Sequence, residues 1–288
     1  AYTPVRWNED YRYLRDPALR TDLVDPIKFI PLSDDGSVHL SLGGQARYRY
    51  EFFENALFGA GPQDDDGFHL LRLLGHADLH LGEHLRAFVQ LKSASADGRT
   101  GGARPVIDED DIDFEQAFAD LKLPLADGSV TLRAGRQNLL YGAQRLISPL
   151  DWTNTRRTFD GGNASFSFQY HTLDLVVVRP VIVDEGPLNS SDDDQLFAGL
   201  YDTIALPARF GTAAKLDLYA LFLDEENAPF FQGPADQERY TLGARLSGNP
   251  KPFDYDLELA YQLGEAGAGD ISAWSVAAEL GYRFADAP

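Results

Sequence analysis

The chain has 288 residues, a formal net charge of -20 at pH 7 and no cysteine. It therefore has neither disulfides nor thiolate chemistry, and its acidity argues against nucleic acid as a partner, because phosphate binding needs a basic face. No run of about 18 consecutive apolar residues occurs, which excludes a transmembrane helix but not transmembrane strands, whose apolar and polar residues alternate.

Residues 1–36 are punctuated by proline and aspartate and predict an irregular or short helical lead-in. From residue 37 the pattern changes to a period of two, which is typical of a half-buried strand. Along residues 37–53 one face carries apolar and aromatic residues from Val38 to Phe52, and the other is hydrophilic. This first strand is therefore long, apolar on one side and polar on the other.

The same alternation recurs to the end of the chain. It is clear in residues 70–81, 85–92, 116–123, 129–134, 164–170, 172–178, 214–222, 239–247, 255–263 and 273–284. We count about a dozen strands of the order of ten residues, the length that a tilted strand needs to cross a bilayer. The pattern predicts an all-β protein, an antiparallel transmembrane β-barrel in one domain over residues 1–288. A soluble β-sandwich or β-solenoid is the alternative, although sandwich strands are usually about 5–6 residues long.

The connections between these strands alternate between tight turns and long acidic loops, among them residues 223–238, as in outer-membrane barrels. The aspartate runs in the loops are either solvated surface or calcium ligands, because Ca²⁺ prefers clustered carboxylates. The candidates for calcium are Asp64, Asp65, Asp66, Asp192, Asp193 and Asp194. None of these runs has the spacing of an EF-hand loop, and no other cofactor is predicted.

If the apolar face meets lipid, the polar face lines a lumen with a modest excess of basic residues. A narrow passage focuses the field of its wall charges, so such an excess attracts anions. The wall arginines that we consider as substrate contacts are Arg47, Arg49, Arg72, Arg133, Arg239 and Arg245. The competing interpretation is that arginines and aspartates of this face pair across strands and only hold the barrel in shape.

One segment, residues 135–162, departs from the strand pattern. Several glycines and a proline interrupt it, so it cannot be one continuous strand. We expect this segment to fold into the lumen and constrict it. Guanidinium groups bind carboxylates in a bidentate manner, so such a constriction suits a polyanion or an acidic sugar. The charged residues of the segment are Arg136, Arg145, Arg156 and Arg157 against Asp151 and Asp160.

Ordered motifs across most of the chain resemble one family. They are RWNEDYRYLRD, DPIKFIPL, LSLGGQARYRYEFFEN, RAFVQLKS, DFEQAFADLKL, LRAGRQNLLYGAQRLISP, NTRRTFDG and AWSVAAELGYRF. In this order they resemble the alginate-export family of outer-membrane β-barrel porins. The resemblance implies a monomeric barrel of 18 strands in the bacterial outer membrane. It also implies that an anionic polysaccharide, an alginate-like uronate polymer, leaves the cell through an arginine-lined lumen, with periplasmic export machinery as a further partner.

The same resemblance assigns substrate contacts to particular motifs. Asp160, in NTRRTFDG, is expected to orient the neighbouring arginines through salt bridges. The sequence SPLDWTN replaces a charged segment of relatives, so we expect a constriction of different shape and substrate. Relatives also continue beyond ELGYRFADAP, so the resemblance predicts further C-terminal strands. The contacts assigned are Arg47 and Arg49 in GGQARYRYE, Arg136 in GRQ, Arg145 in QRL, and Arg156 and Arg157 in NTRRTFDG.

Three alternatives to polysaccharide export remain open. In the same membrane setting, the protein is a small-molecule porin for acidic sugars or other organic anions. As an enzyme it would be a polysaccharide lyase, built on Arg145 with Tyr141 or on His76 with His80. The hydrolase, phosphate-loop and zinc-protease motifs are absent, and we predict no enzyme activity. As a structural or adhesive outer-membrane protein, it would keep all its arginines paired.

Overall fold

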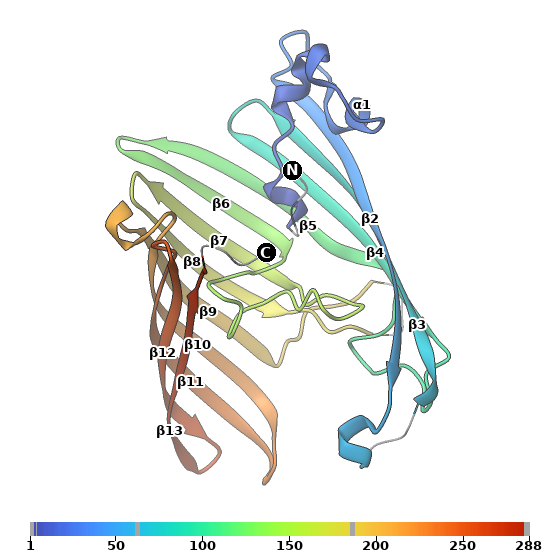
Figure 1. The fold of residues 1–288 in the computed structure, drawn as a ribbon, viewed down its shortest axis with the longest axis vertical. Helices are drawn as coiled ribbons and strands as arrows, with labels where there is room; N and C mark the ends of the chain where they lie inside the picture. The colour runs from blue at the N-terminus through green and yellow to red at the C-terminus, as the bar shows by residue number, and fades with distance from the viewer. Residues whose placement is uncertain (1–2, 4, 61–63, 185–187, 285–288) are drawn as a thin grey trace.

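The alternating segments pair with their neighbours in chain order, and together they form a curved wall (Figure 1). The computed structural model describes residues 3, 5–60, 64–184 and 188–284. Over these residues the strands are β1 (Ile30–Pro31), β2 (Val38–Phe53), β3 (Asp64–Leu81), β4 (Leu85–Asp97), β5 (Asp110–Leu125), β6 (Gly128–Gln137), β7 (Phe159–Phe168), β8 (His171–Pro180), β9 (Gln195–Ala205), β10 (Lys215–Phe230), β11 (Gly233–Gly248), β12 (Phe253–Ala266) and β13 (Gly269–Tyr282).

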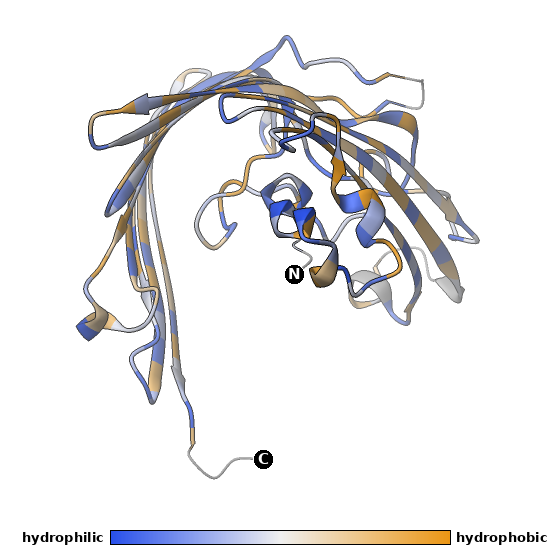
Figure 2. Ribbon diagram, turned by 90° about the horizontal axis from the view of Figure 1, so that it is seen from above, coloured by the Kyte–Doolittle hydropathy of each residue, from blue (hydrophilic) through white to orange (hydrophobic). Residues whose placement is uncertain are grey.

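Over the described residues the protein is all-β, a 13-stranded antiparallel sheet in which each strand pairs with the next. Seen from above, the sheet forms an open arc rather than a ring (Figure 2). The short strand β1 covers only His39 and Leu40 of β2, and β13 pairs with β12 alone within the described part of the chain. The predicted antiparallel wall is confirmed, and the structure does not close this wall into a barrel.

The lead-in before β2 folds into single turns of helix and lies inside the curve of the sheet (Figure 2). Its Tyr11, Leu14 and Phe29 form a small buried cluster. Among the described residues, no helix is long and apolar enough to cross a bilayer. The helical turns of the chain are η1 (Arg6–Asn8), η2 (Arg12–Arg15), η3 (Pro17–Leu19), α1 (Asp25–Lys28), η4 (Ala56–Gly59) and η5 (Ala208–Phe210).

The two faces of the sheet differ as the alternation predicts, because successive side chains of a strand point to opposite faces. On the convex face large apolar side chains are exposed, for example Tyr48 at 65% and Trp274 at 75%. On the concave face lie charged and polar residues such as Arg72, Asp78 and Lys92, and these are buried. The sheet is therefore apolar on the outside and polar on the inside.

The alternation did not predict one of the strands, and one expectation about a loop was wrong. Strand β9 shows no polar and apolar alternation, because its inward residues Phe197 and Tyr201 are themselves apolar and pack against other groups on the concave side. The acidic segment 223–238, expected as a long loop, instead extends β10 and β11, which are joined by a two-residue turn. Backbone pairing continues past the point where one face stops being apolar, so charged side chains do not mark the end of a strand.

Candidate functional site

The segment between β6 and β7, residues 138–158, leaves the wall and crosses the concave side of the sheet (Figures 1 and 2). We call it the inward loop. Its chain reverses direction at Gly142, Gln144 and Leu150, which all adopt positive φ. Only glycine takes this conformation freely, so surrounding contacts must hold the other two residues there. Inward folding was expected for residues 135–162 and is found for 138–158, while residues 135–137 and 159–162 belong to the wall strands β6 and β7.

An apolar cluster holds the first half of the inward loop. Leu139 and Ile147 pack against Phe159, Val178 and Leu221 on the inner faces of β7, β8 and β10, and Val176, Tyr201 and Tyr219 complete the cluster. These inner positions would be polar in a wall that faced only water. The apolar run at 175–178 marks this docking area in the sequence, where the sequence pattern indicated only one more alternating strand over 172–178.

An ionic cluster holds the second half of the loop against β2 and β3. The Asp151 carboxylate lies 2.8 Å from Nη2 of Arg72 and 2.7 Å from Nη2 of Arg156. Both guanidinium groups are almost completely buried. Arg47 donates to the backbone carbonyls of Asp151 and Thr153. These arginines therefore position the loop, and their positive charge is largely balanced or turned toward backbone oxygens.

Burial raises the pKa of Asp151, but the charges of Arg156 and Arg72 outweigh this effect and lower it below the usual range. The carboxylate is therefore ionised at neutral pH. Asn154 adds a second attachment, because its side-chain amide donates to the carbonyl oxygens of Leu71, Ser95 and Asp108. The loop is thus tied to three neighbouring parts of the wall.

The tip of the inward loop reaches the opposite flank of the sheet. Arg145 Nη1 lies 3.0 Å from Asp256 Oδ1 and 2.8 Å from Glu258 Oε2 on β12, and Nη2 pairs with Glu279 on β13. Together with the Asp151 cluster, these bonds connect the loop to strands at both ends of the arc. The loop therefore spans the interior from β2 and β3 to β12 and β13.

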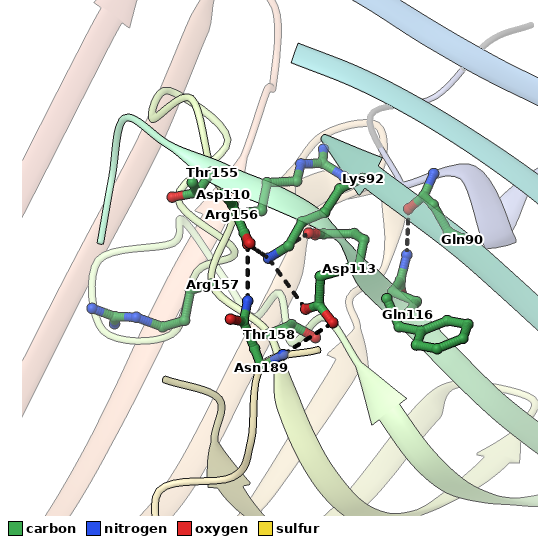
Figure 3. A network of polar contacts seen from close by, with 12 residues as sticks. Gln90, Lys92, Asp110, Asp113, Gln116, Thr155, Arg156, Arg157, Thr158 and Asn189 are labelled. Carbon is green, nitrogen blue, oxygen red and sulfur yellow. Dashed lines mark hydrogen bonds and ion pairs between the residues drawn. The ribbon is translucent and has the colours of Figure 1, made fainter. Parts of the chain in front are cut away.

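A buried polar network lies beside the loop and is formed by residues of β4, β5 and the β8–β9 connection (Figure 3). Lys92 Nζ lies 2.8 Å from Asp110 Oδ2, and Asn189 Nδ2 donates to the same carboxylate. The backbone nitrogen of Asn189 donates to Asp113. In Figure 3 the side chain of Arg157 extends away from this network. These residues fix β4, β5 and the β8–β9 connection to one another.

Most of the remaining predicted contact residues are also paired. Arg133 forms a bidentate ion pair with Asp120, with Nε 2.7 Å from Oδ1 and Nη2 2.8 Å from Oδ2. Its guanidinium also lies over the rings of Trp7 and Phe118. Arg136 donates to Asp160, Asp113 and the carbonyl oxygen of Asn189, so the carboxylate of Asp160 pairs with an arginine of the neighbouring strand β6. The other two pairs are Arg245 with Asp217 and Asp256, and Arg49 with Glu51.

Three predicted arginines, Arg47, Arg157 and Arg239, have no carboxylate partner among the described residues, and Arg47 donates to backbone carbonyls instead. Within the described part of the chain Arg157 makes no side-chain hydrogen bond, and it is exposed on the concave side. Arg239 donates only to Gln237 Oε1, and its Nε is buried without an acceptor. Arg157 and Arg239 line a cavity of about 620 Å³ between the inward loop and the inner faces of β9 to β12. Both arginines were predicted as substrate contacts from the sequence, but their position in one cavity could not be predicted from it.

The other sites proposed from the sequence find less support. Among the residues whose side chains are described, no three carboxylate or imidazole groups converge to hold a metal ion, and the side chains of Asp64, Asp65 and Asp66 lie outside the described set. The Tyr141 hydroxyl accepts a hydrogen bond from Asn163. Burial and the nearby Asp174 carboxylate raise the pKa of Tyr141 far above its usual value, which makes it a poor base for a lyase.

Comparison with protein-family models gives a match over most of the chain. Residues 38–288 match a family model described as alginate export. The match begins at the first residue of β2 and covers every strand from β2 to β13. A search of curated proteins found no match.

Proposed function

Because the chain belongs to the alginate export family, a transport family rather than an enzyme family, we propose that it forms an outer-membrane pore for an anionic polysaccharide such as a uronate polymer. The observation that carries the proposal is the inward loop. It crosses the interior of a wall that is apolar outside and polar inside, and it presents an unpaired arginine there. Family membership implies the outer membrane as the location.

We further infer that in the membrane the wall closes into a barrel, the 18-stranded form that the family resemblance implies. The convex face, rich in exposed leucine and aromatic side chains, is suited to lipid. The backbone edges of β13 and of most of β2 carry no strand partner within the described residues. Hydrocarbon does not tolerate unpaired backbone groups, so these edges must be paired in a bilayer.

The distribution of charge supports passage of an anion rather than a cation. The wall arginines that have carboxylate partners hold neighbouring segments in place, and they add little positive potential to the interior. Arg157 and Arg239 remain as cations without a carboxylate partner among the described residues, and Arg47 faces only carbonyl oxygens. In a narrow passage of low dielectric, a few uncompensated charges dominate the potential. No nucleic acid partner is proposed; the polymer and periplasmic export machinery are the proposed partners of a monomer.

A small-molecule porin for acidic sugars or other organic anions is the second candidate. It is favoured by the small number of free arginines, because a polymer would gain most from a continuous track of them. The two candidates differ in what blocks the pore. A chain of uronates occupies several cationic positions at once, whereas a monomer occupies one.

We expect oligouronates to block ion current through the full chain in planar bilayers at concentrations well below those of monomeric glucuronate. Arg157→Gln should weaken the block by the oligomer about tenfold, the loss of one charge-assisted contact. Arg209→Gln, in the connection between β9 and β10, removes the same charge away from the loop and should leave the block unchanged. Equal block by monomer and oligomer would contradict polymer export, and equal block by neutral oligosaccharides would contradict both candidates.

A further inference from the structure

The cavity beside the inward loop differs in character from the rest of the concave side. Its volume of about 620 Å³ lies within the range of small-molecule sites, about 300–1,000 Å³. Most of its lining residues are apolar, and they come from both the loop and the wall. Leu146 and Leu150 face it from the loop, Val181 from the β8–β9 connection, and Phe197, Leu221 and Leu223 from β9 and β10. An apolar chamber of this size is not needed for a hydrophilic polymer.

The polar groups of the cavity are largely satisfied by one another. Glu225 accepts hydrogen bonds from the side-chain amides of Gln195 and Gln237, and Gln237 in turn accepts from Arg239. Gln262 donates to Thr241 Oγ1 at 3.1 Å. The remaining donors are the guanidinium of Arg157 and Nε of Arg239, which is buried without an acceptor among the described residues. Because Nε of Arg239 is not accessible, a ligand carboxylate would bind this side chain through Nη1, which donates no hydrogen bond among the described residues, and would bind Arg157 through its exposed guanidinium.

The lining also carries two acidic residues, Glu225 and Asp192. Both oxygens of Glu225 accept hydrogen bonds from side-chain amides, and Asp192 accepts from the backbone nitrogen of Asp194. These neutral donors fix the two carboxylates in place but leave their charge, which repels an anion. A ligand carboxylate is therefore expected at the arginines and away from Glu225 and Asp192, with its body against the apolar residues of the lining.

We propose that this cavity binds a small monocarboxylate whose body is apolar, such as an alicyclic or aromatic acid. The carboxylate contacts Arg157 and Arg239, and the body packs against Leu150, Phe197 and Leu223. A uronate would place its hydroxyl groups against these apolar residues without partners, which costs binding free energy. This ligand differs from the exported polymer. The inference rests on the proposed function in one respect, because the ligand enters the cavity through the proposed pore.

The test is calorimetric titration of the full chain in detergent with three ligands of similar size. These are cyclohexanecarboxylate, the neutral cyclohexylmethanol and the hydrophilic glucuronate. Cyclohexanecarboxylate should bind at least about tenfold more tightly than either of the others, because only it satisfies both the charged and the apolar parts. Arg239→Gln and Arg157→Gln should each weaken its binding about tenfold, and Arg209→Gln should not.

Leu223→Asn separates the apolar contribution from the charge. It should weaken binding of cyclohexanecarboxylate and leave that of glucuronate unchanged. Equal affinity for the three ligands, or unchanged affinity in both arginine variants, would overturn the proposal. Because binding is measured in detergent without a membrane, the cavity site can be confirmed even if oligouronates fail to block the current, and that failure would count only against polymer export.

Discussion

Asp151→Asn is expected to detach the inward loop from β2 and β3. The substitution keeps the shape of the side chain but removes the charge that Arg72 and Arg156 face, and both guanidinium groups are almost completely buried. Loss of one partner from a buried ion pair costs about 3–5 kcal/mol. The Asp151 side chain is 45% exposed, so we expect a loss near the lower value, about 3 kcal/mol.

The measurement is trypsin cleavage of the folded protein at Arg145, Arg156 and Arg157. These sites should become accessible in Asp151→Asn, and single-channel conductance should rise as the loop leaves the interior. Asp193→Asn is the matched control, since that carboxylate is 93% exposed and lies 3.8 Å from Arg179. A variant with wild-type cleavage and conductance would show that the Asp151 cluster does not hold the loop.

The ion pairs of Asp151 also determine the acidic pH at which the inward loop of the wild-type protein detaches. The pKa of Asp151 is lowered in the folded state, so its contribution is fully present above the unfolded value near 3.9 and is lost as the pH falls through the lower folded value. Conductance should therefore stay constant between about pH 7 and pH 5 and rise only below about pH 4.

Ile147→Ala is expected to have the second largest effect, because it removes the side chain that anchors the first half of the loop. Ile147 is 7% exposed and packs in the cluster formed with Phe159, Val178 and Leu221. Truncation of a buried isoleucine to alanine costs about 2–5 kcal/mol. We expect a lowered midpoint of thermal unfolding and faster tryptic cleavage at Arg145.

Leu140→Ala provides the comparison for this variant. It lies in the same loop but is 39% exposed, so it should lose little stability. Similar losses in the two variants would mean that the apolar cluster does not anchor the loop.

The architecture of the wall could be predicted because the alternation of apolar and polar residues is repeated in nearly every strand. Alternation alone locates β2, β3 and β12, whose two faces differ strongly in polarity. It fails at β9, where Phe197 and Tyr201 face inward against the loop cluster. It also misjudges the acidic extensions of β10 and β11, because the backbone ladder does not depend on side-chain polarity.

The site was predicted less completely than the wall. Composition marked the segment that folds inward, since glycine, proline and four arginines interrupt a strand pattern. Which arginines remain free depends on partners more than a hundred residues away, such as Asp256 for Arg145. Spacing along the chain carries no information about such pairs. The interpretation that the arginines pair with acids holds for most of them, and it does not hold for Arg47 and Arg239 of the wall or for Arg157 of the loop.

The most direct test of the central claim, that the inward loop narrows an anion-conducting pore, is the reversal potential of the ion current under a KCl gradient in planar bilayers. The net charge of -20 by itself favours cations, whereas the unpaired arginines beside the loop favour anions. We predict an anion preference in the wild-type protein that Arg157→Glu together with Arg239→Glu converts to a cation preference. A wild-type pore that prefers cations, or a double variant with unchanged reversal potential, would contradict the claim.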